Sequence, residues 1–185
     1  AQMDGFLLVV RAFESDLVMH PNGSVDAKRD ADSMLSELLL NDLIAVERKL
    51  ERLVDERKKG GTDKALNEKQ TVLFTRLHEA LNNGTPLRKL DYSHEDVKEL
   101  SSFGLLSRKP VLVVFNLSEG QSAPQMELDM PSVALMGKLE MEIAQLSAED
   151  AEMFMQEYGI KELSLNKMIR LSYDLLQVQS FFTVG

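Results

Sequence analysis

The strongest constraint on the fold is a run of apolar residues spaced alternately four and three positions apart. Its members are Leu39, Leu43, Val46, Leu50 and Leu53. A mean spacing of 3.5 residues is the repeat of a narrow helical seam that packs against another helix, whereas a helix on a globular core has a wider apolar face. The sequence therefore predicts a long helix from about Asp30 to Lys59 that needs a helical partner.

A second helical pattern follows directly and supplies that partner. Gly60-Gly61-Thr62 interrupts the first helix, and the second runs from about Asp63 to Leu81. Its predicted seam residues are Leu66, Leu73, Leu77 and Ala80. Because the connecting turn is short, the two helices are expected to run antiparallel, as a coiled-coil hairpin.

Short apolar runs outside the hairpin predict strands. Phe6 to Val10 and Pro110 to Phe115 are continuous runs, the pattern of strands buried on both faces of a parallel sheet. Ser132 to Leu135 is a third candidate strand, and Phe181 to Val184 a fourth. Helices are predicted over 94–103, 139–146, 148–158 and 165–176, with Ser93 and Ser147 as caps. Strands alternating with helices indicate an α/β fold interrupted by the hairpin.

Composition excludes several classes of function. The 185 residues include no cysteine, which rules out disulfide scaffolds and thiolate metal sites. The three histidines are far apart in the sequence, which disfavours a His-rich zinc site. The net charge of −9 opposes general binding to phosphate backbones or anionic lipid. No apolar run is long enough to cross a bilayer, so we expect a cytoplasmic protein that does not bind membranes.

Charge is unevenly distributed along the chain. Residues 28–109 contain 16 basic and 15 acidic residues, whereas the remainder contains 5 and 15. Arg57, Lys58 and Lys59 gather beside the predicted hairpin turn. Basic residues at a helix end complement its free carbonyl groups, so either this structural role or contact with RNA fits them.

Several ordered segments resemble the YchF subfamily of Obg-like P-loop NTPases, the ribosome-binding ATPases. The matching segments are 4–14, 23–30, 37–42, 47–53, 109–116, 137–146 and 169–185, which together extend over nearly the whole chain. The resemblance implies the C-terminal part of a P-loop G domain in residues 1–27 and 104–178. It also implies a helical coiled-coil insertion in residues 28–103 and the start of a truncated TGS domain in residues 179–185.

The resemblance also implies a nucleotide-base pocket for ATP or GTP, made of two loops. In the first, Asn116, Leu117, Ser118 and Glu119 stand where related GTPases carry the guanine-reading motif Asn-Lys-x-Asp. A carboxylate at the last position accepts hydrogens from guanine N1 and its 2-amino group, and adenine offers neither donor there. Glu119 is therefore expected to decide base preference, Asn116 to bind the base edge and Leu117 to stack on it. Met136, Gly137 and Lys138 would form the second loop, with Met136 in place of the usual Ser.

No Gly-x-x-x-x-Gly-Lys-Ser/Thr phosphate loop and no Asp-x-x-Gly metal motif occur in these 185 residues. The family would place them, with their Mg²⁺, before Ala1, so we expect no catalytic or metal-ligating residue here and no hydrolysis by this chain alone. The ribosome is the partner that the resemblance implies, and unpaired strand edges of a partial sheet predict self-association. The alternative is a coiled-coil interaction module that binds no nucleotide.

Overall fold

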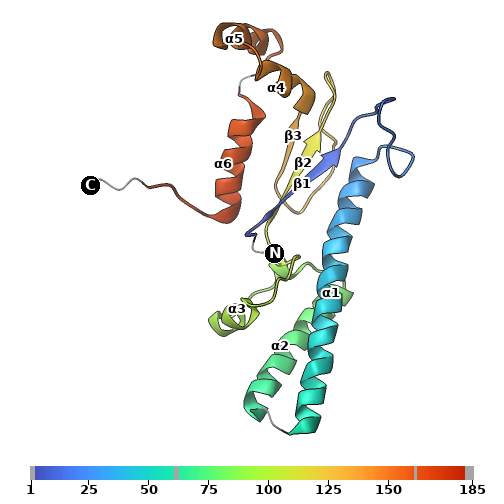
Figure 1. Ribbon diagram of the computed structural model, residues 1–185, viewed down its shortest axis with the longest axis vertical. Coiled ribbons are helices and arrows are strands. Elements are labelled where there is room, and N and C mark those ends of the chain that lie inside the picture. The colour runs from blue at the N-terminus through green and yellow to red at the C-terminus, as the bar shows by residue number, and fades with distance from the viewer. Residues whose placement is uncertain (1–2, 61–62, 161, 182–185) are drawn as a thin grey trace. The chain divides into compact units, whose positions relative to one another are not determined.

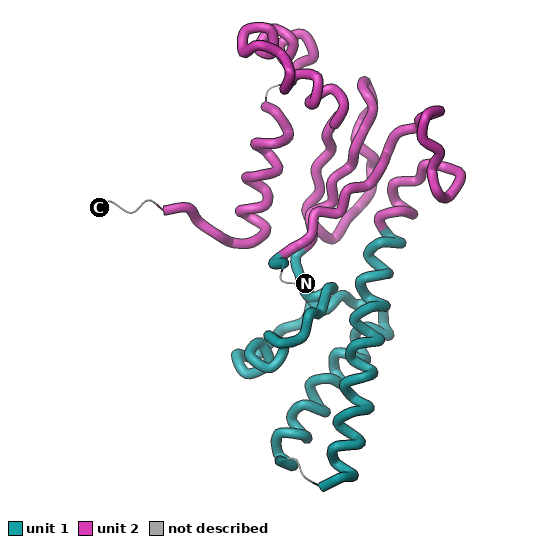
Figure 2. The backbone as a smooth tube through the Cα atoms, viewed as in Figure 1, with its two compact units in different colours: residues 1–4, 32–110 teal, residues 5–31, 111–185 magenta. Residues whose placement is uncertain are grey.

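The protein forms two compact units in a computed structural model that describes residues 3–60, 63–160 and 162–181 (Figure 2). Residues 1–4 and 32–110 make up the first, which we call the helical unit. Residues 5–31 and 111–185 make up the second, which we call the sheet unit. The combination of a parallel sheet with helices confirms the predicted α/β class.

A three-stranded parallel sheet forms the centre of the sheet unit (Figure 1). The strands are β1 (Phe6–Arg11), β2 (Val111–Asn116) and β3 (Ser132–Leu135), in that spatial order. All residues of β2 except the last are buried, because this strand has a neighbour on each side. The predicted parallel pairing is confirmed.

Helix α6 (Ser164–Leu176) packs on one face of the sheet. Its contacting residues are Met168, Leu171 and Leu175, which cover Leu112, Val114 and Val133. The other helices of this unit are α4 (Gly137–Ile143) and α5 (Ala148–Glu157). The first turn of α6 has no side-chain cap of its own, and Glu140 of α4 accepts a hydrogen bond from the Ser164 backbone N–H at 2.8 Å instead.

The prediction that the first strand is buried on both faces is wrong. Leu8 and Val10 are buried, but Leu7 is 49% and Val9 is 58% exposed. The register aligns Leu7 with Leu112 and Val9 with Val114, on the face that carries α6. The core there contains residues of β2, β3 and α6 and none of β1, which lies at the edge of the sheet.

Two long helices form the hairpin, α1 (Ala27–Lys59) and α2 (Lys64–Asn82), and they run antiparallel as predicted (Figure 1). Val46 and Leu53 of α1 are at most 1% exposed and share a core with Phe74 and Leu77 of α2. Leu39, Leu43 and Leu50 pack against that core, so the seam on the first helix is confirmed. Its coiled-coil character stays a prediction. Helix α1 begins earlier than predicted because the Asp26 carboxylate accepts from the Arg29 backbone N–H.

On the second helix, one predicted seam residue is wrong. Leu66 is 46% exposed, and the neighbouring Asn67 is 4% exposed in its place. The Asn67 side-chain amide donates to the Leu53 carbonyl oxygen at 3.0 Å. A buried polar group is stable only when it is hydrogen-bonded, so this contact explains how Asn67 occupies the seam near the hairpin turn.

The rest of the helical unit lies between α2 and β2 in the sequence. It contains the 3₁₀ turn η1 (Leu87–Lys89), which was not predicted, and α3 (His94–Leu100), which ends before the predicted Phe103. Ser93 and Asp96 form the predicted capping box of α3. Ser147 likewise caps α5 as predicted. Phe181 has no regular structure, and the other residues of the predicted last strand lie outside the described residues.

The buried carboxylate of Asp42 joins α1 to residues 106–107. Asp42 is 2% exposed and accepts from the backbone N–H groups of Leu106 at 2.6 Å and Ser107 at 2.7 Å. The Ser107 hydroxyl donates to the same carboxylate at 2.6 Å. The carboxylate is therefore satisfied by three donors, as a buried charged group must be.

Candidate functional site

The predicted site residues fall on two loops of the sheet unit that follow neighbouring parallel strands. Asn116 is the last residue of β2, and Met136 and Gly137 follow the last residue of β3. Because β2 and β3 are parallel and paired, both loops open at the carboxyl edge of the sheet, where α/β proteins bind ligands. The structure thus brings the two predicted halves of the site together.

Asn116 joins the loops that follow all three strands. Its side-chain Oδ1 accepts from the Gly137 backbone N–H at 3.1 Å. Its carbonyl oxygen accepts from the Ala12 backbone N–H, directly after β1, at 2.9 Å. The next residue, Leu117, donates its N–H to the Leu135 carbonyl at 2.8 Å. One asparagine therefore fixes the spacing of the loops at this edge of the sheet.

Position 137 is crowded by the Asn116 side chain, which favours glycine there. A Cβ built on Gly137 would lie 2.9 Å from Asn116 Oδ1 and 3.4 Å from the Leu135 side chain. The contact with Asn116 is shorter than any ordinary Cβ contact, and the opposing atom is itself held by a hydrogen bond. Glycine here allows the second loop to approach the Asn116 side chain closely enough for that bond.

Residues 118–121 form a tight turn with Glu119 at its corner. The Gln121 N–H donates to the Ser118 carbonyl at 3.2 Å, and Gly120 has a φ of +74°. A positive φ at the third of four residues is typical of a type II turn. The Gln121 side chain closes the turn again by accepting from the Ser118 N–H at 2.9 Å. Glu119 is exposed, so its carboxylate is accessible to a ligand.

The other predicted site residues differ in accessibility. Leu117 is 6% exposed, so only a small part of its side chain is available to stack on a base. The Lys138 side chain is 86% exposed, and its Nζ lies 4.0 Å from a Glu142 carboxylate oxygen. Met136 precedes α4 without giving it a side-chain cap. Of the second loop, Gly137 is the residue that contacts the first loop through a hydrogen bond.

Tyr158, at the end of α5, is a neighbour of the site that the sequence analysis missed. The negative charge of Glu119 is the main reason that the pKa of the Tyr158 phenol is raised. Nothing in the spacing of the two residues along the sequence indicates this electrostatic influence, which depends on how α5 folds relative to the turn.

A polar cluster in the loop after β1 was also missed. Asp30 accepts from Arg29 Nε at 3.0 Å and from the Asn22 side chain at 3.1 Å. His20 Nε2 lies 2.9 Å from the other carboxylate oxygen of Asp30. The Arg29 hydrogen bond is the main reason that the pKa of Asp30 lies below its usual value. This cluster orders the connection between β1 and α1.

The described residues contain no candidate metal site and no candidate membrane span. There, no group of three or more His, Cys, Asp or Glu side chains is arranged to hold a metal ion. No helix among the same residues is both long and apolar enough to span a bilayer.

Known proteins that resemble this chain in sequence or in structure share the name YchF. No protein-family model matches the chain. The Ribosome-binding ATPase YchF of Bacillus subtilis is 32% identical over 197 residues, which cover 100% of this chain and 53% of the relative. The protein of the same name from Escherichia coli O157:H7 is 35% identical over 187 residues, covering 96% of this chain and 51% of the relative.

A solved structure agrees with these sequence matches. The Schizosaccharomyces pombe YchF GTPase superposes with a TM-score of 0.80 and 25% identity, covering 98% of this chain and 52% of that one. The similarity in sequence and in fold therefore extends over nearly the whole chain. The chain belongs to the YchF family, and it spans about half the length of the curated relatives it matches.

Proposed function

We propose that the chain provides the base-recognition part of an ATP- or GTP-binding site in a protein that associates with ribosomes. The observation that carries the proposal is the hydrogen bond between Asn116 Oδ1 and the Gly137 N–H, which joins the two predicted base-contacting loops. The relatives are named as an ATPase and a GTPase, in agreement with a nucleotide ligand.

The chemistry of the two loops fits a nucleotide base. Asn116 presents an amide at the carboxyl edge of the sheet, and Glu119, three residues later, presents an exposed carboxylate. A carboxylate accepts hydrogen bonds and donates none when ionised, so it favours the guanine edge that carries the N1 and 2-amino donors, which adenine lacks at those positions. Glutamate is one methylene longer than the aspartate of guanine-reading loops. We infer that this length moves the carboxylate away from the guanine donors and relaxes the base preference.

Nucleotide titration tests this function. The measurement compares fluorescent adenine and guanine nucleotides on the wild-type protein and on Glu119→Asp, using the 185-residue chain and a version that carries a phosphate-binding segment before residue 1. We expect the extended protein to bind adenine nucleotide, and guanine to gain affinity in Glu119→Asp. If neither nucleotide binds the extended protein, the non-enzymatic interaction module becomes the better account.

The parent protein's Mg²⁺ and its hydrolytic step are assigned to no residue of this chain. Phosphoryl transfer depends on a phosphate cradle and metal ligands, which the resemblance places before residue 1. The role proposed for residues 116–119 and 136–138 is therefore to bind and orient the base. The proposal also includes the division of the chain into a partial G domain, an insertion at residues 28–103 and a TGS domain that starts at residue 179. A cytoplasmic location is proposed as well.

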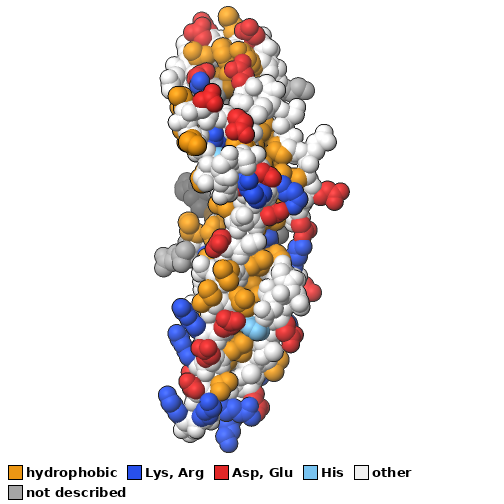
Figure 3. All heavy atoms as spheres, turned by 90° about the vertical axis from the view of Figure 1, so that its right-hand side faces the viewer, with side chains coloured by type: hydrophobic (Ala, Val, Ile, Leu, Met, Phe, Trp, Pro, Cys, Tyr) orange, Lys and Arg blue, Asp and Glu red, His pale blue; other side chains and the backbone are white. Residues whose placement is uncertain are grey.

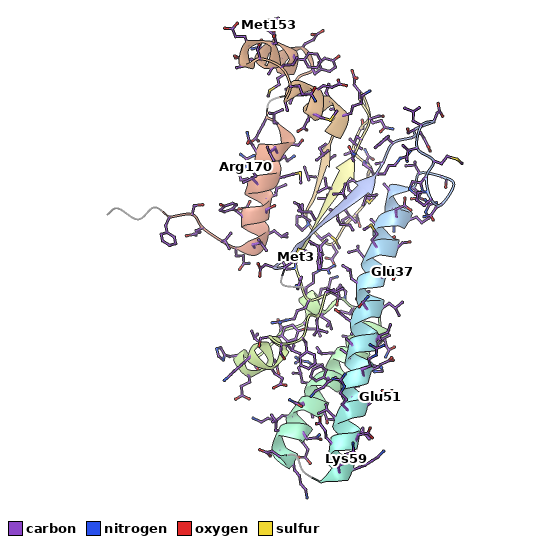
Figure 4. All side chains as sticks on the ribbon, viewed as in Figure 1. Met3, Glu37, Glu51, Lys59, Met153 and Arg170 are labelled. Atoms are coloured by element: carbon purple, nitrogen blue, oxygen red, sulfur yellow. The ribbon has the colours of Figure 1, made fainter. Side chains whose placement is uncertain are left out.

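We further propose that the hairpin tip contributes to ribosome association. Arg57, Lys58 and Lys59 occupy the last turn of α1 and are exposed, and Lys64 begins α2 beside them. Figure 3 shows Lys and Arg side chains gathered at this end of the hairpin, and Lys59 is labelled there in Figure 4. Exposed cations without buried partners suit the phosphate backbone of RNA.

Charge reversal at the tip tests this partner. We expect Lys58→Glu with Lys59→Glu to weaken co-sedimentation with ribosomes and to reduce its dependence on salt. The matched control reverses two exposed lysines elsewhere, Lys98→Glu with Lys167→Glu, and so has the same net charge. Equal binding by the tip variant and the wild type would show that the tip makes no contact.

Self-association is a separate proposal, supported by the exposed side chains of β1. Leu7 and Val9 form an apolar pair on an edge strand, a feature that favours pairing between copies. Light scattering of the isolated chain tests it. A monomeric mass at high protein concentration would refute it.

A further inference from the structure

Helix α5 has an apolar face that the sheet unit does not bury. At about 100° per residue, five side chains of the helix and its C-cap lie within an arc of about 120°. In order around the helix they are Phe154, Tyr158, Ala151, Met155 and Ala148. An amphipathic helix normally packs such a face against a core, yet no residue of α5 is buried. The face is therefore available to a binding partner.

A groove of about 620 Å³ runs along this face. Its apolar lining includes Ala151, Met155 and Ile160. The Ile160 backbone N–H donates to the Met155 carbonyl at 2.8 Å, and Gly159 before it has a φ of +65°. This is a common way for a helix to end, and here it returns an apolar residue to the helix face. Met155 is flexible and polarizable, so it can adapt to the side chain of a partner.

The surroundings of the groove are acidic. From Leu139 to Ile160 the chain has six acidic residues and no basic one. Glu149, Glu152 and Glu157 are exposed on α5 and form no ion pair with any residue that the structure describes. Figure 3 shows hydrophobic side chains with Asp and Glu side chains around them at the α5 end of the sheet unit. Such a surface attracts cations and repels phosphate groups.

We propose that this face of α5 is a docking site for a basic amphipathic helix of another protein. The apolar side of that helix enters the groove, and its Lys and Arg side chains meet the unpaired glutamates. Insertion of an amphipathic helix into an apolar groove is a recurrent mode of recognition, and the complementary charges select the partner. A second copy that used its own α5 here would bring two acidic rims together. The proposal is independent of base recognition, because no residue of 116–119 or 136–138 lines the groove.

Fluorescence polarisation with the 185-residue chain tests the docking site. The probe is a labelled peptide of about 18 residues, or five helical turns, with leucines on one face and lysines on the other. One control peptide has the same composition in scrambled order, and a second has glutamate in place of lysine. We expect only the first peptide to bind, and its affinity to fall as the salt concentration rises. No binding by the first peptide, or equal binding by the scrambled one, would overturn the proposal.

Paired variants test the charges. Glu149→Gln with Glu152→Gln should weaken peptide binding about two- to tenfold, because two exposed attractions are lost. The matched control is Glu37→Gln with Glu51→Gln, which changes the net charge equally at two exposed positions of α1 labelled in Figure 4. The control should leave the affinity unchanged. An equal effect of the two pairs would show that the peptide responds to net charge and has no site on α5.

A second variant tests the apolar lining. Met155→Gln keeps the length of the side chain and makes it polar, and it should weaken binding about three- to tenfold. Met34→Gln is the matched control, because Met34 is 47% exposed on α1. Circular dichroism verifies that each variant keeps its helices. An affinity unchanged by Met155→Gln would overturn the groove as the place of contact.

Two further results would assign the face to a different occupant and so overturn the proposal. If light scattering finds a dimer that Met155→Gln converts to a monomer, a second copy covers the face. If the extended version described above does not bind the peptide while the 185-residue chain does, the parent protein covers the face itself.

Discussion

Replacing Asp42 by alanine should destabilise the protein more than any exposed change on the same helix. The substitution leaves two backbone N–H groups and the Ser107 hydroxyl without their acceptor, in a place where Asp42 is 2% exposed. Each buried donor left unpaired costs about 1–3 kcal/mol. Removal of a buried charge and the better helix propensity of alanine each offset part of this loss, the latter by about 0.5 kcal/mol. We therefore expect a net loss of about 2–4 kcal/mol.

Urea unfolding followed by circular dichroism measures this loss as a shift of the midpoint at constant slope. Asp42→Asn should lose about half as much, because one amide oxygen still accepts while the amide N–H₂ faces a donor. Glu37→Ala is the control, since Glu37 is exposed on α1, and should change the stability by less than about 0.5 kcal/mol (Figure 4). A loss below about 1 kcal/mol for Asp42→Ala would refute the view that these hydrogen bonds hold α1 to residues 106–107.

Three further predictions concern the loops and caps. Gly137→Ala should separate the two site loops, because the added Cβ would clash with the Asn116 side chain. The substitution should lower both the melting temperature and the nucleotide affinity. If both stay unchanged, the close approach of the Gly137 backbone to Asn116 is contradicted. Arg29 lowers the pKa of Asp30 in the folded protein, so the ionised carboxylate stabilises the fold. This contribution is fully present above the pKa that Asp30 has in the unfolded chain, and it is lost as the pH falls through the folded pKa. The stability difference between wild type and Asp30→Asn, measured by urea unfolding, should accordingly shrink between pH 7 and pH 3, and a constant difference would count against it. Ser93→Ala should cost about 1 kcal/mol in the same assay by removing the cap of α3, and should be partly rescued by Ser93→Asn.

Periodicity and capping residues account for most of what the sequence could predict about the fold. The alternating spacing from Leu39 to Leu53 placed the seam of α1 correctly, because heptad spacing is a local property of the chain. Ser93 and Ser147 marked helix starts for the same reason. The exposure of Leu7 and Val9 could not be predicted, since it depends on which strands α6 covers.

The sequence proposed the residues of the candidate site but could not predict their contacts. The resemblance identified Asn116 and Gly137, but the hydrogen bond between them requires two strands to lie side by side. The buried role of Asn67 follows from tertiary packing that propensity does not encode. Tyr158 had no signal at all, because a tyrosine that ends a helix far along the chain has no characteristic pattern.

Helix α1 belongs to both units, because its first residues lie in the sheet unit and the rest in the helical unit. Its 33 residues run without interruption from Ala27 to Lys59, a length of about 50 Å. A single helix, with no intervening loop, therefore contains both Asp30 of the polar cluster and the basic residues of the hairpin tip.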